Sequence, residues 1–227
     1  MLALAIDTSS AAVSAALAQV TADGETTVVS RRRVVDARAH AELLAPSIAA
    51  CLAEAGVPVD ALDAVVAGTG PGPFTGLRVG LMTAAAIADA RDIPAYGVCS
   101  LDAMAPPTGA VLVAGDARRR EVYWAAYLDG TRSRGPEVGR AGDVPTDGLT
   151  AMAGAGARLY ADVLGLPLLE PDYPDLEAVV RLAAARILAR APGEPLTPLY
   201  LRRPDAVASA AYSTLSPGAS SVGPEPR

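Results

Sequence analysis

Two short apolar runs, each followed directly by an aspartate, constrain the fold of this chain more than any other feature. Residues 2–6 lead into Asp7, and residues 110–115 lead into Asp116. Apolar runs of this length, bounded by turn residues, predict buried strands. Further strand patterns follow in both halves, so that the first half opens as an antiparallel meander. The sequence therefore predicts a duplicated α/β architecture.

Helical patterns connect these strands. The first covers residues 39–55 and ends at a glycine, which is a common helix stop. The second covers residues 75–90, with Thr75 as its expected N-cap. The third covers residues 176–191 and is strongly amphipathic, with apolar side chains on one face and arginines largely opposite.

A Pro-Pro pair at residues 106 and 107 predicts a hinge between two lobes. We expect residues 1–106 to form the first lobe and residues 107–205 to form the second. Residues 206–227 are rich in Ser, Pro and Gly, a composition that is typical of a disordered tail.

The basic residues exclude several classes of protein. All 19 of them are arginine, so a Walker A phosphate loop and a Schiff-base lysine are excluded. The net charge of -6 argues against binding nucleic acid over the whole surface, which needs a positive footprint. Short arginine runs at residues 31–33, 118–120 and 202–203 are interpreted as solvated turns or strand ends, with partner contact as the alternative.

Signals for metal binding, export and membrane insertion are missing from the sequence. The single histidine, His40, excludes paired-His zinc sites, and Cys51 and Cys99 are too far apart to form a metal or redox motif. No stretch approaches the ~20 apolar residues of a membrane span, and the N-terminus lacks the basic flank of a signal peptide. We therefore expect a cytoplasmic protein.

The turn after the first strand is a candidate phosphate site. Asp7, Thr8, Ser9 and Ser10 form it, and a phosphate-binding turn usually contains glycine, which lets backbone donors approach the ligand. This turn has none. The alternative is a polar turn whose Asp and Ser side chains bond to their own backbone.

A glycine- and proline-rich loop at residues 68–78 is the most distinctive segment. It runs from a strand into a helix, where anion sites form. However, Pro71 and Pro73 have no N–H, so the loop cannot present an unbroken row of donors. We interpret it as a loop built for rigidity and close packing.

Two groups of charged residues indicate a functional site only weakly. His40 and Glu42 are two residues apart on a helix, so their side chains diverge, and a structural role for His40 is favoured. Asp116, Arg118 and Glu121 place opposite charges around a hairpin. These residues either stabilise the turn or present a contact surface.

Six stretches of the sequence together resemble one bacterial family, TsaB, also called YeaZ. They occur in the family's order and cover residues 1 to about 205: AIDTSS, HAELLAP, GTGPGPFTGLRVG, SLDAMA, DARRREVYWAAY and PLYLRR.

The resemblance implies a two-lobed, duplicated actin-like and Hsp70-like ATPase fold (the ASKHA fold). It also implies a role in adding threonylcarbamoyl to adenosine 37 of tRNAs that read ANN codons. In that machinery the catalytic subunit is the paralogue TsaD, which holds a metal, and TsaE is an ATPase. The chain is then a non-catalytic scaffold that pairs with a TsaD-like subunit, works with a TsaE-like ATPase and reaches tRNA only through the complex. Self-association is left open.

The resemblance also implies which residues take part. The pairing surface should lie on the two helices of the first lobe, although part of the candidate set is expected to be core. The candidate anchors are Leu43, Leu44, Leu81, Met82 and Ala85, with Arg78 and Arg118 as polar candidates. Asp7, Thr8 and Ser9 would be the remnant of a nucleotide site. No cofactor or metal is expected on this chain alone, because ATP and the metal belong to the partner subunits.

Two enzyme hypotheses remain as alternatives. An ATPase or sugar-kinase-like member of the same fold would need carboxylates around Mg²⁺, which Asp7 and Asp116 could supply. A peptidase is disfavoured because the sequence offers no metal cluster and no Ser or Cys nucleophile with a credible base.

Overall fold

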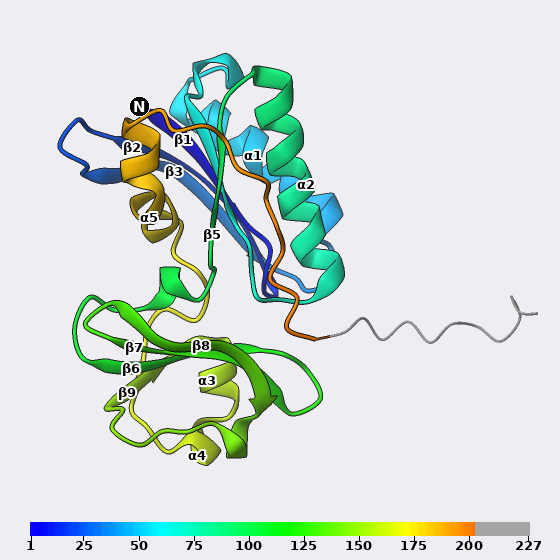
Figure 1. The fold of residues 1–227 in the computed structure, drawn as a ribbon. Coiled ribbons are helices and arrows are strands. Elements are labelled where there is room, and N and C mark those ends of the chain that lie inside the picture. The colour runs from blue at the N-terminus through cyan, green and yellow to red at the C-terminus, as the bar shows by residue number, and fades with distance from the viewer. Residues whose placement is uncertain (203–227) are drawn as a thin grey trace, which may run out of the picture.

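The structure is a computed structural model that describes residues 1–202, and these form two lobes, each built on one five-stranded sheet (Figure 1). In the first sheet, β1 is the middle strand, antiparallel to β2 and parallel to β4. From edge to edge the strands are β3 (Thr26–Val35), β2 (Ala12–Val20), β1 (Leu2–Asp7), β4 (Ala64–Gly68) and β5 (Ala95–Val98).

The second sheet repeats this arrangement. Its middle strand is β6, which pairs antiparallel with β7 and parallel with β9. From edge to edge the strands are β8 (Thr131–Arg140), β7 (Glu121–Leu128), β6 (Ala110–Asp116), β9 (Ala151–Ala153) and β10 (Leu168–Leu169). The middle strands of the two sheets end at Asp7 and Asp116, so the predicted duplicated α/β architecture is confirmed.

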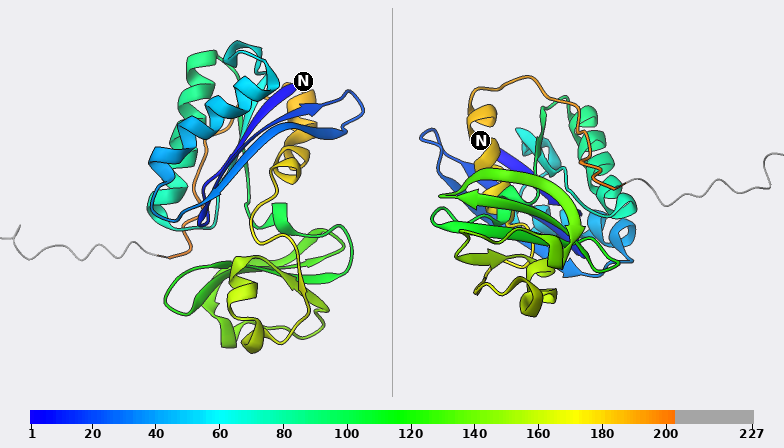
Figure 2. Two further views of the ribbon diagram at one scale, coloured as in Figure 1. Left: turned by 180° about the vertical axis from the view of Figure 1, so that it is seen from behind. Right: turned by 60° about the horizontal axis from the view of Figure 1, so that its bottom comes forward.

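Helices cover both faces of the first sheet, as Figure 2 shows. α1 (His40–Ala55) and α2 (Phe74–Arg91) lie on one face, and α5 (Leu176–Leu188) lies on the other. Side chains alternate along β1, so Leu4 and Ile6 pack under α1 and α2, whereas Ala3 and Ala5 pack under α5. The small alanines let α5 approach the sheet closely.

The position of α5 corrects the expected lobe boundary. We expected residues 107–205 to belong to the second lobe, but α5 shares its core cluster with β1, β2, β4 and β5. After α5 the chain runs back along the first lobe to residue 202 (Figure 1). The reason is the apolar face of α5, which covers the otherwise open face of the first sheet. The expected tail at residues 206–227 lies outside the described residues.

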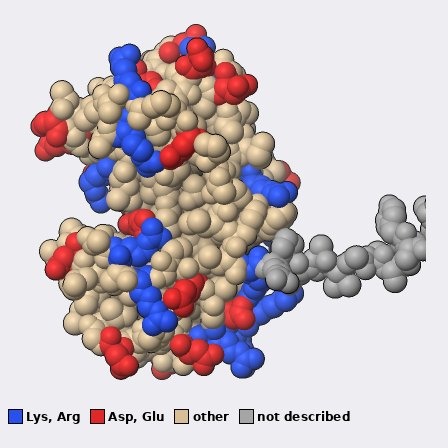
Figure 3. Space-filling model, viewed as in Figure 1, with Lys and Arg blue, Asp and Glu red and all other residues tan. Residues whose placement is uncertain are grey.

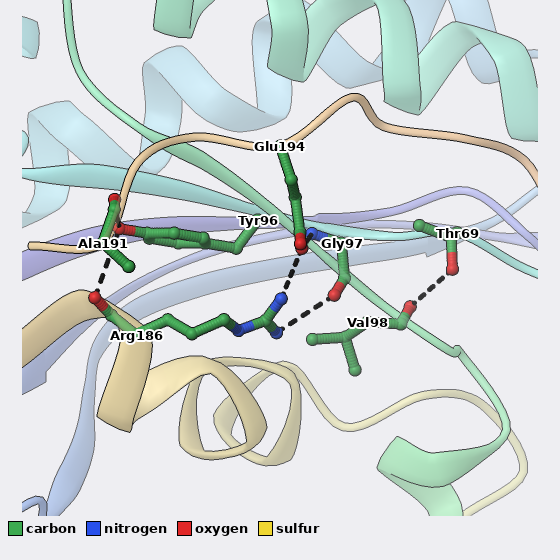
Figure 4. Close-up of polar contacts among 7 residues, drawn as sticks. All are labelled: Thr69, Tyr96, Gly97, Val98, Arg186, Ala191 and Glu194. Atoms are coloured by element: carbon green, nitrogen blue, oxygen red, sulfur yellow. Dashed lines mark hydrogen bonds and ion pairs between the residues drawn. The ribbon is translucent and has the colours of Figure 1, made fainter. Parts of the chain in front are cut away.

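The segment after α5 covers the edge strand β5 (Figure 4). The Glu194 backbone N–H donates to the Ala95 carbonyl at 3.0 Å, and its carboxylate accepts from the Gly97 N–H at 2.8 Å. Arg186 of α5 pairs with Glu194 and donates to the Gly97 carbonyl at 3.1 Å. These bonds satisfy backbone groups that an edge strand leaves unpaired.

The second lobe has little helix. Two short helices, α3 (Ala155–Leu159) and α4 (Ala161–Leu164), lie beside its sheet. Single 3₁₀ turns occur at Val59–Ala61, Asp102–Met104 and Ala141–Asp143. Strand β8 was not predicted, because most of its side chains are exposed and it lacks an apolar alternation.

A polar cluster joins the connection between the lobes to the second sheet. The Tyr127 hydroxyl of β7 donates to Asp102 Oδ1 at 2.7 Å, and Arg132 of β8 lies 3.5 Å from Asp102 Oδ2. Burial raises the pKa of Tyr127, and the neighbouring Asp102 carboxylate raises it further. The phenol therefore stays protonated and keeps donating.

None of the helices within residues 1–202 is long and apolar enough to cross a membrane.

The substitution Tyr127→Phe tests the polar cluster. We expect it to lower the free energy of unfolding by about 1.5–3 kcal/mol, the range for a hydrogen bond to a charged acceptor. Urea denaturation measures the change. Tyr160→Phe is the control, because no described residue bonds the Tyr160 hydroxyl, and it should change stability by less than about 0.5 kcal/mol. Equal effects of the two substitutions would contradict the prediction.

Candidate functional site

The candidate site lies where β1 and β4 end at the same edge of the first sheet. Parallel strands bring their carboxyl ends together, and in open α/β sheets ligands bind at such edges. Here the turn after β1 meets the glycine-rich loop after β4 and the start of α2. The residues predicted to form a nucleotide-site remnant, Asp7, Thr8 and Ser9, are all brought to this edge, and all three are buried.

The Asp7 carboxylate is fully engaged within the lobe. Its Oδ1 accepts from the Ser9 N–H at 2.9 Å and the Ser9 hydroxyl at 2.8 Å, and its Oδ2 accepts from the Ser100 hydroxyl at 2.6 Å. Burial raises the pKa of Asp7, and the hydrogen bonds from Ser100 and Ser9 oppose that rise. The bond from the Ser9 backbone is the one that the polar-turn interpretation predicted.

The Thr8 hydroxyl is inserted into α2. It donates to the Gly76 carbonyl at 2.7 Å and accepts from the Gly80 N–H at 3.0 Å. In a regular helix these two backbone groups bond to each other. Thr8 thus bridges them, and the turn after β1 is locked to the first turns of α2.

The glycines of this region allow the close approach. A Cβ atom at Gly68 would lie 1.8 Å from Asp7 Oδ2, and one at Gly72 would lie 2.1 Å from the Ser9 carbonyl oxygen. These positions have no room for a side chain because the turn after β1 occupies that space. The interpretation of the loop as one built for close packing is confirmed.

The start of α2 differs from the expectation. The helix begins at Phe74, with Pro73 at the N-cap and no side-chain cap, so the prediction of Thr75 as N-cap is wrong. Pro73 has φ -60°, a value that already suits a helix. The helix therefore begins directly after it, and Thr75 falls inside the first turn.

A cavity of about 200 Å³ lies between the lobes. Ser9 and Ser10 of the first lobe and Asp116 and Arg118 of the second are among its lining residues. Small-ligand pockets usually measure ~300–1,000 Å³, so this space is small for a nucleotide. Asp7 is not part of the lining, and hence the two carboxylates of the ATPase alternative do not share the cavity.

His40 has a structural contact. Its Nε2 lies 2.8 Å from the Ser10 carbonyl oxygen, and because a carbonyl only accepts, this nitrogen donates. The ring is buried at the first residue of α1, whereas Glu42 is exposed. The interpretation of His40 as a structural residue is confirmed. Among residues 1–202, no group of three or more His, Cys, Asp or Glu side chains is placed to hold a metal.

The candidate interface residues on α1 and α2 separate into core and surface. Leu44 and Leu81 are 1% and 4% exposed and belong to the core cluster under the two helices. Their prediction as surface anchors is therefore wrong, because each points toward the sheet. Leu43 and Ala85 are half-buried, whereas Met82 is 66% exposed.

The outer surfaces of α1 and α2 carry two exposed stripes. Each stripe repeats every four residues, the spacing that aligns side chains along one helix face. On α1 the stripe is Ala41, Ala45, Ala49 and Ala53; on α2 it is Arg78, Met82, Ala86 and Ala90. Small side chains on both helices would let partner helices approach closely.

Arg78 takes part in an aromatic cluster that the sequence did not predict. Its guanidinium lies 3.9 Å from the centroid of the Phe74 ring, and its Nε donates to the Tyr200 hydroxyl at 2.7 Å. Phe74 is the only phenylalanine of the chain, and its place in an otherwise Gly- and Pro-rich loop was a signal that could have been read. Arg118, the other polar candidate, is exposed and lies 3.7 Å from Asp116.

Comparisons with known proteins agree with this geometry. The sequence matches the family described as TsaD, tRNA N6-adenosine threonylcarbamoyltransferase, over residues 34–162, more than half of the chain. A solved structure described as an uncharacterized protein with similarity to peptidase YEAZ, from Pseudomonas aeruginosa, is 30% identical with a TM-score of 0.72, covering 88% of this chain and 99% of that one. The chain belongs to the TsaB (YeaZ) family.

Other relatives extend the comparison. The tRNA threonylcarbamoyladenosine biosynthesis protein TsaB of Escherichia coli is 38% identical over 55% of this chain and 54% of its own length. An uncharacterized protein of Mycobacterium tuberculosis is 52% identical over 89% of this chain and 92% of its own. The fold expected from the TsaB resemblance, a duplicated actin-like ASKHA fold, is confirmed.

A double-mutant cycle between Thr8 and Gly80 tests how the turn is locked to α2. A Cβ atom at Gly80 would lie 2.3 Å from Thr8 Oγ1. Gly80→Ala should therefore destabilise the protein by about 1–3 kcal/mol, although Ala is the better helix former. In a Thr8→Ala background the same change should cost far less, because the clashing hydroxyl is gone. Denaturation of all four variants gives the coupling energy, and additive effects would contradict the contact.

Leu81 and Met82 are neighbours on α2 with opposite environments. Leu81→Ala should lower the free energy of unfolding by about 2–5 kcal/mol because it leaves a cavity in the core. Met82→Ala should change it by less than about 0.5 kcal/mol. Chemical denaturation of the isolated chain compares the two, and a large loss for Met82→Ala would show that the side chain is not free at the surface.

Proposed function

We propose that this chain is a non-catalytic subunit of the machinery that adds threonylcarbamoyl to adenosine 37 of tRNAs reading ANN codons. Its TsaB relatives are named for threonylcarbamoyladenosine biosynthesis. The chain pairs with a TsaD-like catalytic subunit, and a TsaE-like ATPase is a further partner. ATP and the metal belong to those partners, and this chain needs neither.

The observation that carries the non-catalytic assignment is that the polar side chains of the turn after β1 are already hydrogen-bonded within the protein. The Asp7 carboxylate is hydrogen-bonded to Ser9 and Ser100, and the Thr8 hydroxyl is hydrogen-bonded to backbone groups of α2. A phosphate would have to displace these bonds, and a displaced buried polar group costs about 1–3 kcal/mol. The small interlobe cavity supports the same conclusion.

The pairing surface is the outer face of α1 and α2. The two exposed stripes supply small side chains along both helices, with Met82 as the one large apolar group that projects. A stable interface needs about 800 Å² per partner, an area that two helices of 16 and 18 residues can offer. Leu43 and Ala85, half-buried at the rim of these stripes, extend the contact.

The substitution Met82→Asp tests the pairing surface. Co-expression with the TsaD-like subunit of the same organism, followed by size-exclusion chromatography, should show a complex for the natural chain. Met82→Asp should weaken that complex by at least about 30-fold, corresponding to ~2 kcal/mol for a buried anchor that becomes a charge. Leu182→Asp is the matched control, since Leu182 is also exposed on a helix, 47%, but lies on α5.

The proposed function also predicts the results of two activity assays, tRNA threonylcarbamoylation and ATP hydrolysis. tRNA threonylcarbamoylation should require both chains, and the isolated chain should neither hydrolyse ATP nor bind it at sub-millimolar affinity. If the Met82→Asp chain still co-elutes with the TsaD-like subunit, the outer face of α1 and α2 is not the pairing surface. Turnover of ATP by the purified chain alone would overturn the non-catalytic assignment.

A further inference from the structure

Strand β3 is an edge of the first sheet, and within residues 1–202 it pairs with β2 alone. The Asp36 N–H donates to the Ala11 carbonyl at 2.9 Å, just beyond the end of this strand pair. Hydrogen-bonded and non-hydrogen-bonded pairs alternate along an antiparallel ladder. The backbone N–H and C=O groups of Arg31, Arg33 and Val35 therefore point away from β2, where a further strand can pair with them.

The other sheet edges are less suited to an added strand. β5 is covered by the segment after α5, and β10 has only two residues. β8 contains Pro136, which has no N–H, and its register with β7 shifts twice. β3 contains neither Gly nor Pro, and its register with β2 is unbroken over residues 30–35. It is the long, regular edge that the described part of the chain leaves open.

The side chains of Arg31 and Arg33 project to the face of the sheet that α5 covers. They lie opposite Ala16 and Ser14 of β2, and Ala16 belongs to the core cluster under α5. Both arginines line two adjacent hollows of about 330 and 380 Å³ near the start of α5, and Arg181 of α5 lines the larger one. Figure 3 shows arginine side chains on this side of the molecule, above the indentation between the lobes.

Two of these three arginines have charge to offer a partner. Arg31 and Arg181 are exposed, and neither has an ion-pair or hydrogen-bond partner for its side chain among residues 1–202. Arg33 is held in position, because its guanidinium donates to the Pro174 carbonyl at 2.6 Å and to the Ser14 hydroxyl at 3.3 Å. The groove therefore presents one fixed and two uncommitted guanidinium groups.

The carboxylates that line the hollows, Asp175 and Glu170, do not neutralise these arginines. Glu170 lies 2.7 Å from Arg158, which is outside the lining. Asp175 is the N-cap of α5, and its Oδ1 accepts from the Glu177 N–H at 3.4 Å. The surface beside β3 is consequently basic, although the whole chain has a net charge of -6.

Arg32 projects to the opposite face of the sheet, where it pairs with Glu54 of α1. Its Nη1 donates to the Arg31 carbonyl at 2.9 Å, in agreement with a carbonyl that points away from β2. Both residues are exposed, so water can replace this contact. An incoming backbone N–H could therefore take its place at little cost.

We propose that the β3 edge binds an extended acidic protein segment, which adds a sixth strand to the first sheet. Side chains two apart on a strand share a face, so carboxylates at alternate positions would lie opposite Arg31 and Arg33. Opposite charges directly across a strand pair are stabilising. Apolar side chains at the intervening positions would lie on the face of Val34, which is 39% exposed.

Other occupants fit this edge less well. A second copy of the chain, paired edge to edge about Arg32, would place arginine opposite arginine, which is destabilising. For a single RNA strand, the described residues that line the hollows include no aromatic ring on which a base could stack. The inference goes beyond the proposed function, because this edge is separate from the outer face of α1 and α2.

Fluorescence anisotropy of the full chain tests the charge pattern. The probe is a fluorescein-labelled ten-residue peptide in which Glu and Val alternate, titrated at low salt. The control peptide has the same composition with Glu and Val in two blocks, so it cannot place carboxylates at alternate positions. We expect the alternating peptide to bind at least about ten-fold more tightly, since only it can meet both arginines while its valines pack.

N-methylated peptides test whether the backbone pairs with the edge. One version of the alternating peptide carries N-methyl groups on its Glu amides, and the other carries them on its Val amides. Only one of these two sets of N–H groups can face β3. One methylated peptide should therefore lose binding while the other keeps it, and equal binding of the two would contradict strand addition.

A matched pair of charge reversals tests the arginine contact. Arg31→Glu should weaken binding of the alternating Glu–Val peptide about ten-fold and should create binding of an alternating Lys–Val peptide. Arg190→Glu is the control, because Arg190 is also exposed but follows the other end of α5, outside both hollows. It should change neither affinity. Thermal unfolding checks that both variants are folded.

Three results would overturn the proposal. The first is that the natural chain does not bind the alternating Glu–Val peptide. The second is that a folded Arg31→Glu chain binds this peptide as tightly as the natural chain does. The third is that an oligouridylate RNA of equal charge displaces the peptide and binds more tightly, which would assign the arginines to phosphate. The methylated peptides are read on the natural chain, so the test does not depend on any variant folding.

Discussion

The hydrogen bonds of Asp7 and Thr8 join three segments that are distant in the sequence. Asp7 reaches Ser100 after β5, and Thr8 reaches into α2 between Gly76 and Gly80. All of these groups are buried, so a lost partner would leave a polar atom without water. The glycines around the turn follow from this requirement, since any side chain there would separate the segments.

The position of α2 depends on these bonds, and α2 contributes to the proposed pairing surface. Its outward stripe includes Met82 on the face proposed to pair with the catalytic subunit. Its first two turns hold Phe74 and Arg78, whose guanidinium lies over the Phe74 ring. The same contacts that occupy the turn after β1 therefore also orient the helix whose outer face we propose as the pairing surface.

The sequence predicted the parts of the fold whose pattern is local. Strands β1 and β6 are continuous apolar runs, and α5 has a clear apolar face, so their existence followed directly. Periodicity does not reveal which sheet a helix covers, and α5 was therefore assigned to the wrong lobe. β8 was missed because an exposed edge strand has no buried face to produce an alternation.

The candidate site was predictable in position but only partly in detail. The turn and the loop were identified by their composition, yet the insertion of Thr8 into α2 depends on a contact 68 residues away. Leu81 and Met82 are both apolar and adjacent, and a rotation of about 100° per residue separates core from surface. The stack of Phe74 on Tyr200 joins residues that are 126 positions apart in the sequence, which no local pattern encodes.

The return of the chain from the second lobe to the first has a consequence for biosynthesis. One face of the first sheet is covered by α5, and the β5 edge is covered by the segment that follows it. A ribosome therefore completes the whole second lobe before it releases the residues that close the first. Until then the nascent first lobe exposes apolar alanine and valine side chains of β1, β2 and β4, a surface on which chaperones act. The lobe that is translated first is thus the last to become complete.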